Sequence, residues 1–296
     1  MKRKDFLKNA GLGILGGVAA TRLSALDLRV SDFSNSTFDS LEARVGYNHL
    51  PNKSSIVMKN MVLHKANSRG KADHGWLKSN HTFSFANYHN PERMHFGVLR
   101  VLNDDFVEGG KGFGTHPHNN MEIISIPLDG DLEHQDSMGN SGVIKSGDVQ
   151  VMSAGTGIKH SEFNKNADKP VKFLQIWLFP KKKDVEPRYD QMTFKVENRK
   201  NKFQQVLSPN ADDEGVWIHQ DAWFHLGRFD KDQKTEYAVK KAGNGVYAFI
   251  IDGEVIINGQ ALEKRDGLGV WDVSTLDIKA TEDAEILLME VPMSIG

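Results

Sequence analysis

The sequence predicts an all-β protein with little helix. Between Met61 and Pro292 the chain is dominated by short runs of alternating or β-branched apolar residues, and clusters of Gly, Asn and Asp separate these runs. Such runs are typical of strands, and such clusters are typical of turns. The clearest runs are FGVLRVL (96–102), EIISIPL (122–128), VKFLQIWLF (171–179), GVYAFII (245–251) and AEILLMEV (284–291).

Two parts of this region resemble each other, which predicts a duplicated β-domain. In each part an apolar run ends at an acidic turn, Asp129-Gly130-Asp131 in the first and Asp252-Gly253-Glu254 in the second. A polar stretch follows each turn, and then a second run begins with a glycine, Gly147 or Gly267. Small β-barrels often enclose a single ligand pocket, so two such barrels offer two candidate pockets.

The predicted domain boundaries follow from composition. Residues 26–60 are polar and rich in Ser and Asn, as expected of a linker or surface arm. We expect an N-terminal barrel over residues 61–180, a polar connector over 181–214 and a C-terminal barrel over 215–296. In the C-terminal barrel, Asn258-Gly259 between EVII and QALE is typical of a type I′ hairpin.

Composition limits the classes of function. The chain has 296 residues, of which 39% are hydrophobic and 26% charged, and this balance suits one large or two ordinary globular domains. The formal net charge is −2 and no long basic stripe interleaves with aromatic residues, so we expect no nucleic-acid partner. The sequence contains no cysteine, so any metal must be held by nitrogen and oxygen ligands.

The first 25 residues have the outline of an export signal. A basic start precedes an apolar, Gly-rich run over residues 10–20, which is too short to span a bilayer, and small residues follow it. The stretch Arg3-Lys4-Asp5-Phe6-Leu7-Lys8 resembles the core of a twin-arginine signal, with Lys4 in place of the second arginine. We therefore expect export to the periplasm, with no membrane span in the mature protein; without a working signal the protein would stay cytoplasmic.

His116 and His118 form a candidate metal-ligand pair. Residues i and i+2 of a strand point to the same face, so both imidazoles can face the inside of a barrel. Pro117 between them has no N–H for a ladder, which favours an edge strand. About forty residues later, His160 and Glu162 repeat this alternation. Three imidazoles and a carboxylate suit Fe(II), Mn, Ni, Cu or Zn.

Glu122 is the rival carboxylate. It would share a face with His118 only if the strand ran regularly through Asn119 and Asn120, and those residues indicate a turn. Spacing alone leaves both Glu122 and Glu162 open as metal ligands or as residues beside a ligand.

These motifs lie in segments that resemble the pirin family, whose members are bicupins and include bacterial quercetin dioxygenases. The resemblance covers nearly all of the chain after about residue 60. It is carried by HGWLKSNHTFSFANYHNP (74–91), GVLRVLNDD (97–105), GFGTHPHNNMEIISIPLDGDLEHQDSMGN (112–140), GVIKSGDVQVMSAGTGIKHSE (142–162), IHQDAWFHLG (218–227), GNGVYAFIIDGEV (243–255) and RDGLGVWD (265–272).

The resemblance implies two cupin barrels of the jelly-roll type, packed face to face, with metal in the N-terminal barrel. It places the metal ligands on His116, His118, His160 and Glu162, and it leaves open a place for Glu122 beside the metal, without a bond to it. The favoured metal is Fe(II), with Cu, Ni, Mn or Zn as alternatives. The second half of the chain agrees independently, since it has no His-x-His pair before Asp252 and no histidine after His225.

The resemblance implies a metal-dependent dioxygenase that acts on quercetin or another flavonol or enol, with dioxygen as co-substrate and Glu162 as the catalytic proton acceptor. The alternative is a non-enzymatic pirin that senses redox state or binds a protein. Export would exclude a role of the non-enzymatic pirin at DNA, because the mature protein would leave the compartment that holds the DNA. We expect a monomer.

The remaining histidines and aromatic residues have simpler interpretations. His64, His74, His81, His89 and His95 are unpaired in spacing and are expected to be structural, as are His219 and His225. Trp76, Phe83 and Phe113 could line a pocket for an aromatic ligand, although large aromatic residues in β-barrels are more often part of the core.

Overall fold

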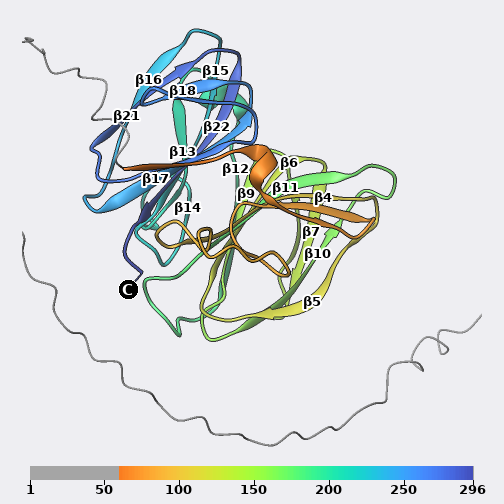
Figure 1. Ribbon diagram of the computed structural model, residues 1–296. Coiled ribbons are helices and arrows are strands. Elements are labelled where there is room, and N and C mark those ends of the chain that lie inside the picture. Colours follow the sequence, from red (N-terminus) through yellow and green to blue (C-terminus); the bar gives the residue numbers. More distant parts are fainter. Residues whose placement is uncertain (1–59, 296) are drawn as a thin grey trace, which may run out of the picture. The chain divides into compact units, whose positions relative to one another are not determined.

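The computed structural model describes residues 60–295, which form twenty-two β-strands and two short 3-10 turns. The predicted all-β class is therefore confirmed for this part of the chain, and the strands form two barrels (Figure 1). The export signal predicted at residues 1–25 and the arm predicted at 26–60 lie outside the described residues, apart from Asn60. Across residues 60–295, no helix has the length and apolar character that crossing a membrane requires.

The first barrel consists of a seven-stranded sheet in the order β12-β9-β6-β11-β4-β3-β2 and a four-stranded sheet in the order β5-β10-β7-β8. The large sheet contains β2 (Gly70–Asp73), β3 (Leu77–His81), β4 (Leu99–Val107), β6 (Glu122–Asp129), β9 (Asp148–Ser153), β11 (Val171–Leu178) and β12 (Arg188–Thr193). The small sheet contains β5 (Gly112–His118), β7 (Asp131–Asp136), β8 (Ser141–Lys145) and β10 (Ile158–Asn164).

The second barrel has the same plan, with sheets in the orders β1-β20-β17-β22-β15-β13-β14 and β16-β21-β18-β19. Its large sheet contains β1 (Met61–His64), β13 (Phe203–Ser208), β14 (Val216–Trp217), β15 (Trp223–Phe229), β17 (Asn244–Asp252), β20 (Gly267–Val270) and β22 (Ala284–Pro292). Its small sheet contains β16 (Lys234–Ala238), β18 (Val255–Ile257), β19 (Gln260–Leu262) and β21 (Thr275–Ala280). The two 3-10 turns, η2 (Ala66–Ser68) and η3 (Val196–Arg199), lie between strands.

The predicted duplication is visible in the strand order and in the turns. In both large sheets the strand before the acidic turn, β6 or β17, pairs with β11 or β22, its counterpart at the end of the repeat. The glycines of those turns, Gly130 and Gly253, have φ values of 80° and 77°, which glycine adopts without strain. The predicted hairpin is also present, with positive φ at Asn258 and Gly259, as a type I′ turn requires.

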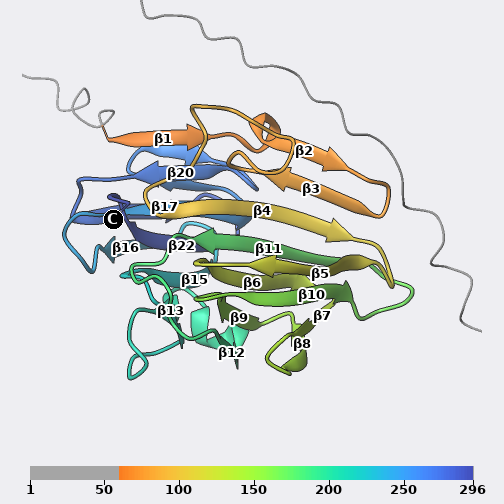
Figure 2. The same cartoon turned by 90° about the horizontal axis from the view of Figure 1, so that it is seen from below.

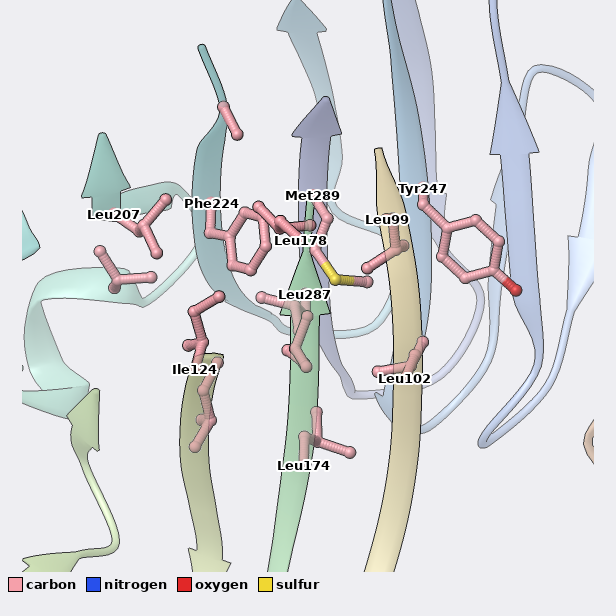
Figure 3. Packing of buried hydrophobic residues seen from close by; sticks show 14 of the residues in the cluster. Leu99, Leu102, Ile124, Leu174, Leu178, Leu207, Phe224, Tyr247, Leu287 and Met289 are labelled. Atoms are coloured by element: carbon pink, nitrogen blue, oxygen red, sulfur yellow. The ribbon is translucent and has the colours of Figure 1, made fainter. Parts of the chain in front are cut away.

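The large sheets of the two barrels pack against each other, which confirms the face-to-face arrangement (Figures 1 and 3). In β17, Tyr247 and Phe249 contribute to this shared core, while Val246 and Ala248 fill the inside of the second barrel. A strand buried on both faces needs apolar residues at every position, which explains the unbroken run GVYAFII. Figure 3 shows Leu99, Leu102, Ile124, Leu174 and Leu178 of the first barrel against Leu207, Phe224, Tyr247, Leu287 and Met289 of the second.

The edge strands of the barrels come from segments that the sequence did not assign to them. β1 lies in the range predicted for the N-terminal barrel, but it pairs with β20 of the second barrel (Figure 2). The segment 181–214, predicted as a connector, contains β12, which pairs with β9 of the first barrel, and β13, which pairs with β15 of the second. Each barrel is thus completed by a strand from outside its own repeat.

The interiors of the barrels differ. In the second barrel a cluster of 16 buried hydrophobic residues fills the inside. Tyr237 of β16 and Leu276 and Ile278 of β21 belong to it, and these strands correspond to β5 and β10 of the first barrel. In the first barrel the interior apolar clusters have only six and four buried members, and polar side chains occupy the space between them.

Candidate metal centre

The structure brings His116, His118 and His160 together on neighbouring strands. In the pairing of β10 with β5, His160 lies opposite His116 and Ile158 lies opposite His118. The Nε2 atom of His160 lies 3.0 Å from Nε2 of His118 and 3.0 Å from Nε2 of His116. Three imidazole nitrogens therefore converge on one point inside the first barrel.

The backbone of β5 places these histidines. β5 is an edge strand, as the sequence predicted from Pro117, whose nitrogen has no hydrogen for a ladder. The pairing with β10 shifts between His160 and Glu162, where an irregular stretch of β5 at Gly114 and Thr115 is accommodated. The Nδ1 atom of His116 donates to the backbone oxygen of Gly114 at 2.8 Å. Because that oxygen only accepts, Nδ1 carries the proton and Nε2 keeps its lone pair for a metal.

A chain of side chains behind His160 sets its tautomer in the same way. Nδ1 of His160 lies 3.4 Å from Nδ1 of His134, and Nε2 of His134 lies 3.3 Å from a carboxylate oxygen of Asp136. The carboxylate accepts from Nε2–H of His134, which leaves Nδ1 of His134 free to accept from Nδ1–H of His160. Nε2 of His160 then keeps its lone pair for a metal, like Nε2 of His116.

Glu162 is buried beside this cluster and is held by two hydrogen bonds. Oγ of Ser125 donates to Oε1 of Glu162 at 3.1 Å, and Nε2 of Gln175 donates to Oε2 at 2.8 Å. A carboxylate oxygen atom of Glu162 lies within 4.8 Å of a ring nitrogen of His160 and of one of His134. Burial raises the pKa of Glu162, against the lowering influence of His134 and of the hydrogen bonds from Ser125 and Gln175.

The imidazoles of His118 and His160 are neutral near pH 7. Burial, and then the neighbouring His116, lower the pKa of His118 to about 4. Burial, followed by the three nearby histidines, lowers the pKa of His160 to about 2. Neutral imidazole is the form that binds metal, so these two histidines are in the metal-binding form at physiological pH.

The donor set fits a transition metal. Nitrogen ligands that bind one ion at about 2.1 Å and at right angles are about 3.0 Å apart, whereas tetrahedral ligands are about 3.4 Å apart. The 3.0 Å separations of the Nε2 atoms match the first spacing. We expect three imidazoles with an adjacent carboxylate to suit a six-coordinate ion with open positions.

Glu122 lies on the other face of its strand and does not flank the cluster. The predicted irregularity is present, since Asn120 has a φ of 48° and β6 begins only at Glu122. Along β6, Ser125 points to Glu162, whereas Glu122 shares its face with Ile124, which packs between the barrels. Its carboxylate accepts a hydrogen bond from Oγ of Ser153 at 2.6 Å. The resemblance left open a position for Glu122 beside the metal. The structure instead places Glu122 on the side of β6 that faces the second barrel.

A cavity of about 390 Å³ adjoins the cluster and is lined by His116, Glu162 and Gln175 among others. This volume lies within the range of about 300–1,000 Å³ found for small-molecule sites. Aromatic side chains form its walls: Trp76 with Phe113, at a ring-centroid distance of 5.6 Å, and Phe85 with Trp177, at 5.4 Å.

The aromatic residues that the sequence offered as pocket-lining candidates lie in two different places. Trp177 contacts the ring of His118 edge to face at 4.9 Å, which links the cavity wall to the histidines. Of the three aromatic residues considered from the sequence, Trp76 and Phe113 line the cavity, and Phe83 lies in the core between the barrels.

Sequence reasoning missed His134, Ser125 and Gln175. His134 is fully buried, and it shares the inner face of β7 with Leu132. The alternation of inner and outer residues can be seen in the sequence DLEHQD. The pairing of His134 on β7 with Glu162 on β10 can be seen only in the tertiary structure. Ser125 and Gln175 are polar interruptions in EIISIPL and VKFLQIWLF, and such interruptions in buried strands were the available signal.

Two face-to-face β-barrels with the same strand order, one of them carrying a histidine cluster, define a bicupin. Within this class the chain belongs to the pirin family. Residues 62–178 match the family model described as Pirin, and residues 205–291 match the model described as Quercetinase C-terminal cupin domain.

Relatives in this family are similar over most of their length. The chain is 46% identical to a quercetin 2,3-dioxygenase of Escherichia coli K12 over 232 residues, which are 78% of this chain and 99% of that protein. It is 42% identical to a pirin-like protein of Caulobacter vibrioides over 75% of this chain and 95% of that one. The solved structure of the bacterial pirin YhhW from Escherichia coli in complex with nickel(II) matches with a TM-score of 0.75 and 44% identity, covering 79% of this chain and 100% of that one.

Proposed function

We propose that this protein is a metal-dependent dioxygenase that opens the heterocycle of a flavonol such as quercetin. The observation that carries the proposal is the convergence of three imidazole nitrogens beside a cavity with aromatic walls. A planar aromatic substrate suits these walls, because offset and edge-to-face contacts favour aromatic pairs. The names of similar proteins, which include quercetin 2,3-dioxygenase, support the same substrate class.

His116, His118 and His160 would hold the metal, and Glu162, whose carboxylate lies near His160, would be the fourth ligand. We propose Fe(II) as the resident ion, with Cu, Ni, Mn or Zn as the alternatives that the same donors accept. When bound, the ion would supply Lewis acidity at this end of the cavity.

Glu162 would also accept the proton of the substrate's enol hydroxyl. Ser125 and Gln175 each occupy one lone-pair position on a different oxygen of its carboxylate, so further lone pairs remain for a metal and for a proton. The two hydrogen bonds fix the carboxylate at the wall of the cavity, where a ligand can reach it.

A direct test uses protein purified without added metal, analysed for its metal content and then loaded with Fe(II). Loss of quercetin absorbance and consumption of dioxygen should proceed together in a constant ratio. Replacement of His116 by alanine should abolish both, and His89→Ala, at an exposed histidine, should leave both unchanged. Metal-loaded protein that consumes neither quercetin nor dioxygen would contradict the proposal and favour the non-enzymatic redox-sensing or protein-binding alternative.

We further propose that residues 1–25 direct export to the periplasm. The family-model match begins at residue 62, after the predicted signal and arm. Removal of the segment would take away five basic residues and one acidic residue, which changes the formal charge from −2 to −6.

The export proposal is tested by N-terminal sequencing of the native protein and by fractionation of cells. Protein that begins near residue 26 in the periplasmic fraction is the expected result. Replacing Arg3 by lysine should retain the protein in the cytoplasm if the twin-arginine route is used. An intact Met1 in the cytosolic fraction of wild-type cells would contradict export.

A further inference from the structure

A row of polar side chains crosses the interior of the first barrel. The strand pairing places His81 opposite Asn103, Asn103 opposite Gln175, and Gln175 opposite Ser125. These four residues come from β3, β4, β11 and β6, which are neighbours in the large sheet. Neighbouring strands are about 4.8 Å apart, so His81 lies about 10 Å along the row from Gln175.

The two ends of the row have different hydrogen bonding. Ser125 and Gln175 are committed to the carboxylate of Glu162. At the other end, Nδ1 of His81 and Oδ1 of Asn103 are buried and have no hydrogen-bond partner within the described part of the chain. His81 and Asn103 are only 3% and 2% exposed, so bulk water does not replace the missing partners.

Unpaired groups of this kind are unfavourable in a folded protein and call for a physical reason. The next row offers a contrast, because Ser79 and Asp105 also lie opposite each other and Oγ of Ser79 donates to the carboxylate of Asp105. The sheet can therefore pair its buried polar groups internally, and in the row of His81 and Asn103 it does not.

Both side chains line the cavity beside the histidine cluster, together with Phe85 and Trp177. A rotation about one side-chain bond of Asn103 or His81 exchanges the ring or amide atoms that face the cavity. A hydroxyl group both donates and accepts hydrogen bonds, so it satisfies either orientation, whereas an unsubstituted aromatic edge satisfies neither.

We propose that His81 and Asn103 are substrate-positioning residues that bind hydroxyl groups on the part of a planar aromatic ligand remote from Glu162. This inference rests on the proposed function for the flavonol class, and it adds that His81 and Asn103 select ligands with hydroxyl groups on the ring remote from Glu162. Glu162 would receive the enol at one end of the row, and His81 and Asn103 would fix the hydroxyl-bearing ring about 5–10 Å away.

The test separates binding from turnover by using two flavones that lack the enol hydroxyl at position 3. Luteolin carries hydroxyl groups on both of its outer ring systems, and unsubstituted flavone carries none. Their dissociation constants are measured by titration calorimetry on the metal-loaded protein without oxygen. The wild type should bind luteolin at least about tenfold more tightly than flavone, as expected from one or two net hydrogen bonds.

Asn103→Leu and His81→Phe should each reduce this preference by about tenfold and leave the affinity for flavone within about twofold. Asn80→Leu is the matched control, since Asn80 lies next to His81 on β3 and points to the opposite face. Asn103→Leu should also melt no lower than the wild type, because it removes a buried group that lacks a partner. That combination of unchanged stability and lost hydroxyl selectivity is not expected of a purely structural residue.

Three results would overturn the inference: an unchanged preference for luteolin in both variants, equal weakening of luteolin and flavone, or a loss of stability that accompanies the loss of binding. Failure of the proposed function is a separate outcome. A protein that binds luteolin through His81 and Asn103 but does not turn over quercetin would contradict the dioxygenase activity and would support the polyphenol site.

Discussion

Replacing His160 with alanine is expected to remove the bound metal and to lower the dioxygenase activity at least about 100-fold. His160 is the central member of the cluster, because its Nε2 atom lies 3.0 Å from the Nε2 atoms of both His116 and His118. Even changes behind a metal ligand typically reduce affinity or activity about 10–100-fold, and loss of the ligand itself has at least that effect. Metal content per chain is the primary measurement, with oxygen consumption as the second.

The matched variants make this result specific. His160→Gln keeps a side chain of similar length and should lose the metal as well, which separates loss of the ligand from the cavity that alanine leaves. His134→Ala should retain partial metal binding, because His134 orients His160 without reaching the same point. Stoichiometric metal in purified His160→Ala would rule out the site described above.

Replacing Glu122 with glutamine is expected to stabilise the protein at pH 8.5 by about 3 kcal/mol, with a much smaller effect near pH 4.5. Burial raises the pKa of Glu122 to about 7, although the hydrogen bonds from Ser153 and from the backbone of His219, and the nearby Arg188, act in the opposite direction. The ordinary value for the unfolded chain is 4.5. The folded protein therefore binds this proton more tightly than the unfolded chain does.

The sign of the pH dependence follows from that difference. The stabilising contribution of the protonated Glu122 is fully present below pH 4.5 and is lost as the pH rises through about 7. The total loss in the free energy of unfolding is about 3 kcal/mol. Glutamine mimics the protonated form and can still hydrogen-bond to Ser153, so the variant should not show this decline.

Urea unfolding of the wild type and the variant at pH 4.5 and pH 8.5 measures the difference. Glu92→Gln serves as the control, because Glu92 is exposed. Equal effects of Glu122→Gln at the two pH values would show that Glu122 does not titrate in this window. The experiment also tests the placement of Glu122, since removal of a residue beside the metal would change metal affinity, and the structure predicts no such change.

The local sequence was sufficient to predict the strands and the histidine positions. Apolar runs such as GVYAFII identify strands because a buried strand needs side chains that water does not solvate. The i and i+2 spacing of His116 and His118, and of His160 and Glu162, identifies shared faces because side chains alternate along a strand. The structure brings the three histidines together as this spacing suggested.

The sequence was less informative where a residue's environment depends on a distant strand. Both Glu122 and Glu162 follow a histidine motif, and only the change of sheet between β5 and β6 puts Glu122 between the barrels. His134 stands in an ordinary alternating strand, and its role follows from the pairing of β7 with β10. His81 was expected to be structural, yet it lines the cavity without a partner for Nδ1 among the described residues.

The sequence by itself thus determined the all-β class, the duplicated barrels, and the strand faces that His116 shares with His118 and His160 shares with Glu162. Only the tertiary structure decided that β1 and β12 close barrels from outside the repeats, that Glu122 faces the core between them, and that His81 and Asn103 border the cavity. The physical reason is that alternation along a strand is a local property of the backbone. The choice of neighbouring strand instead depends on burial and hydrogen bonding summed over the whole sheet.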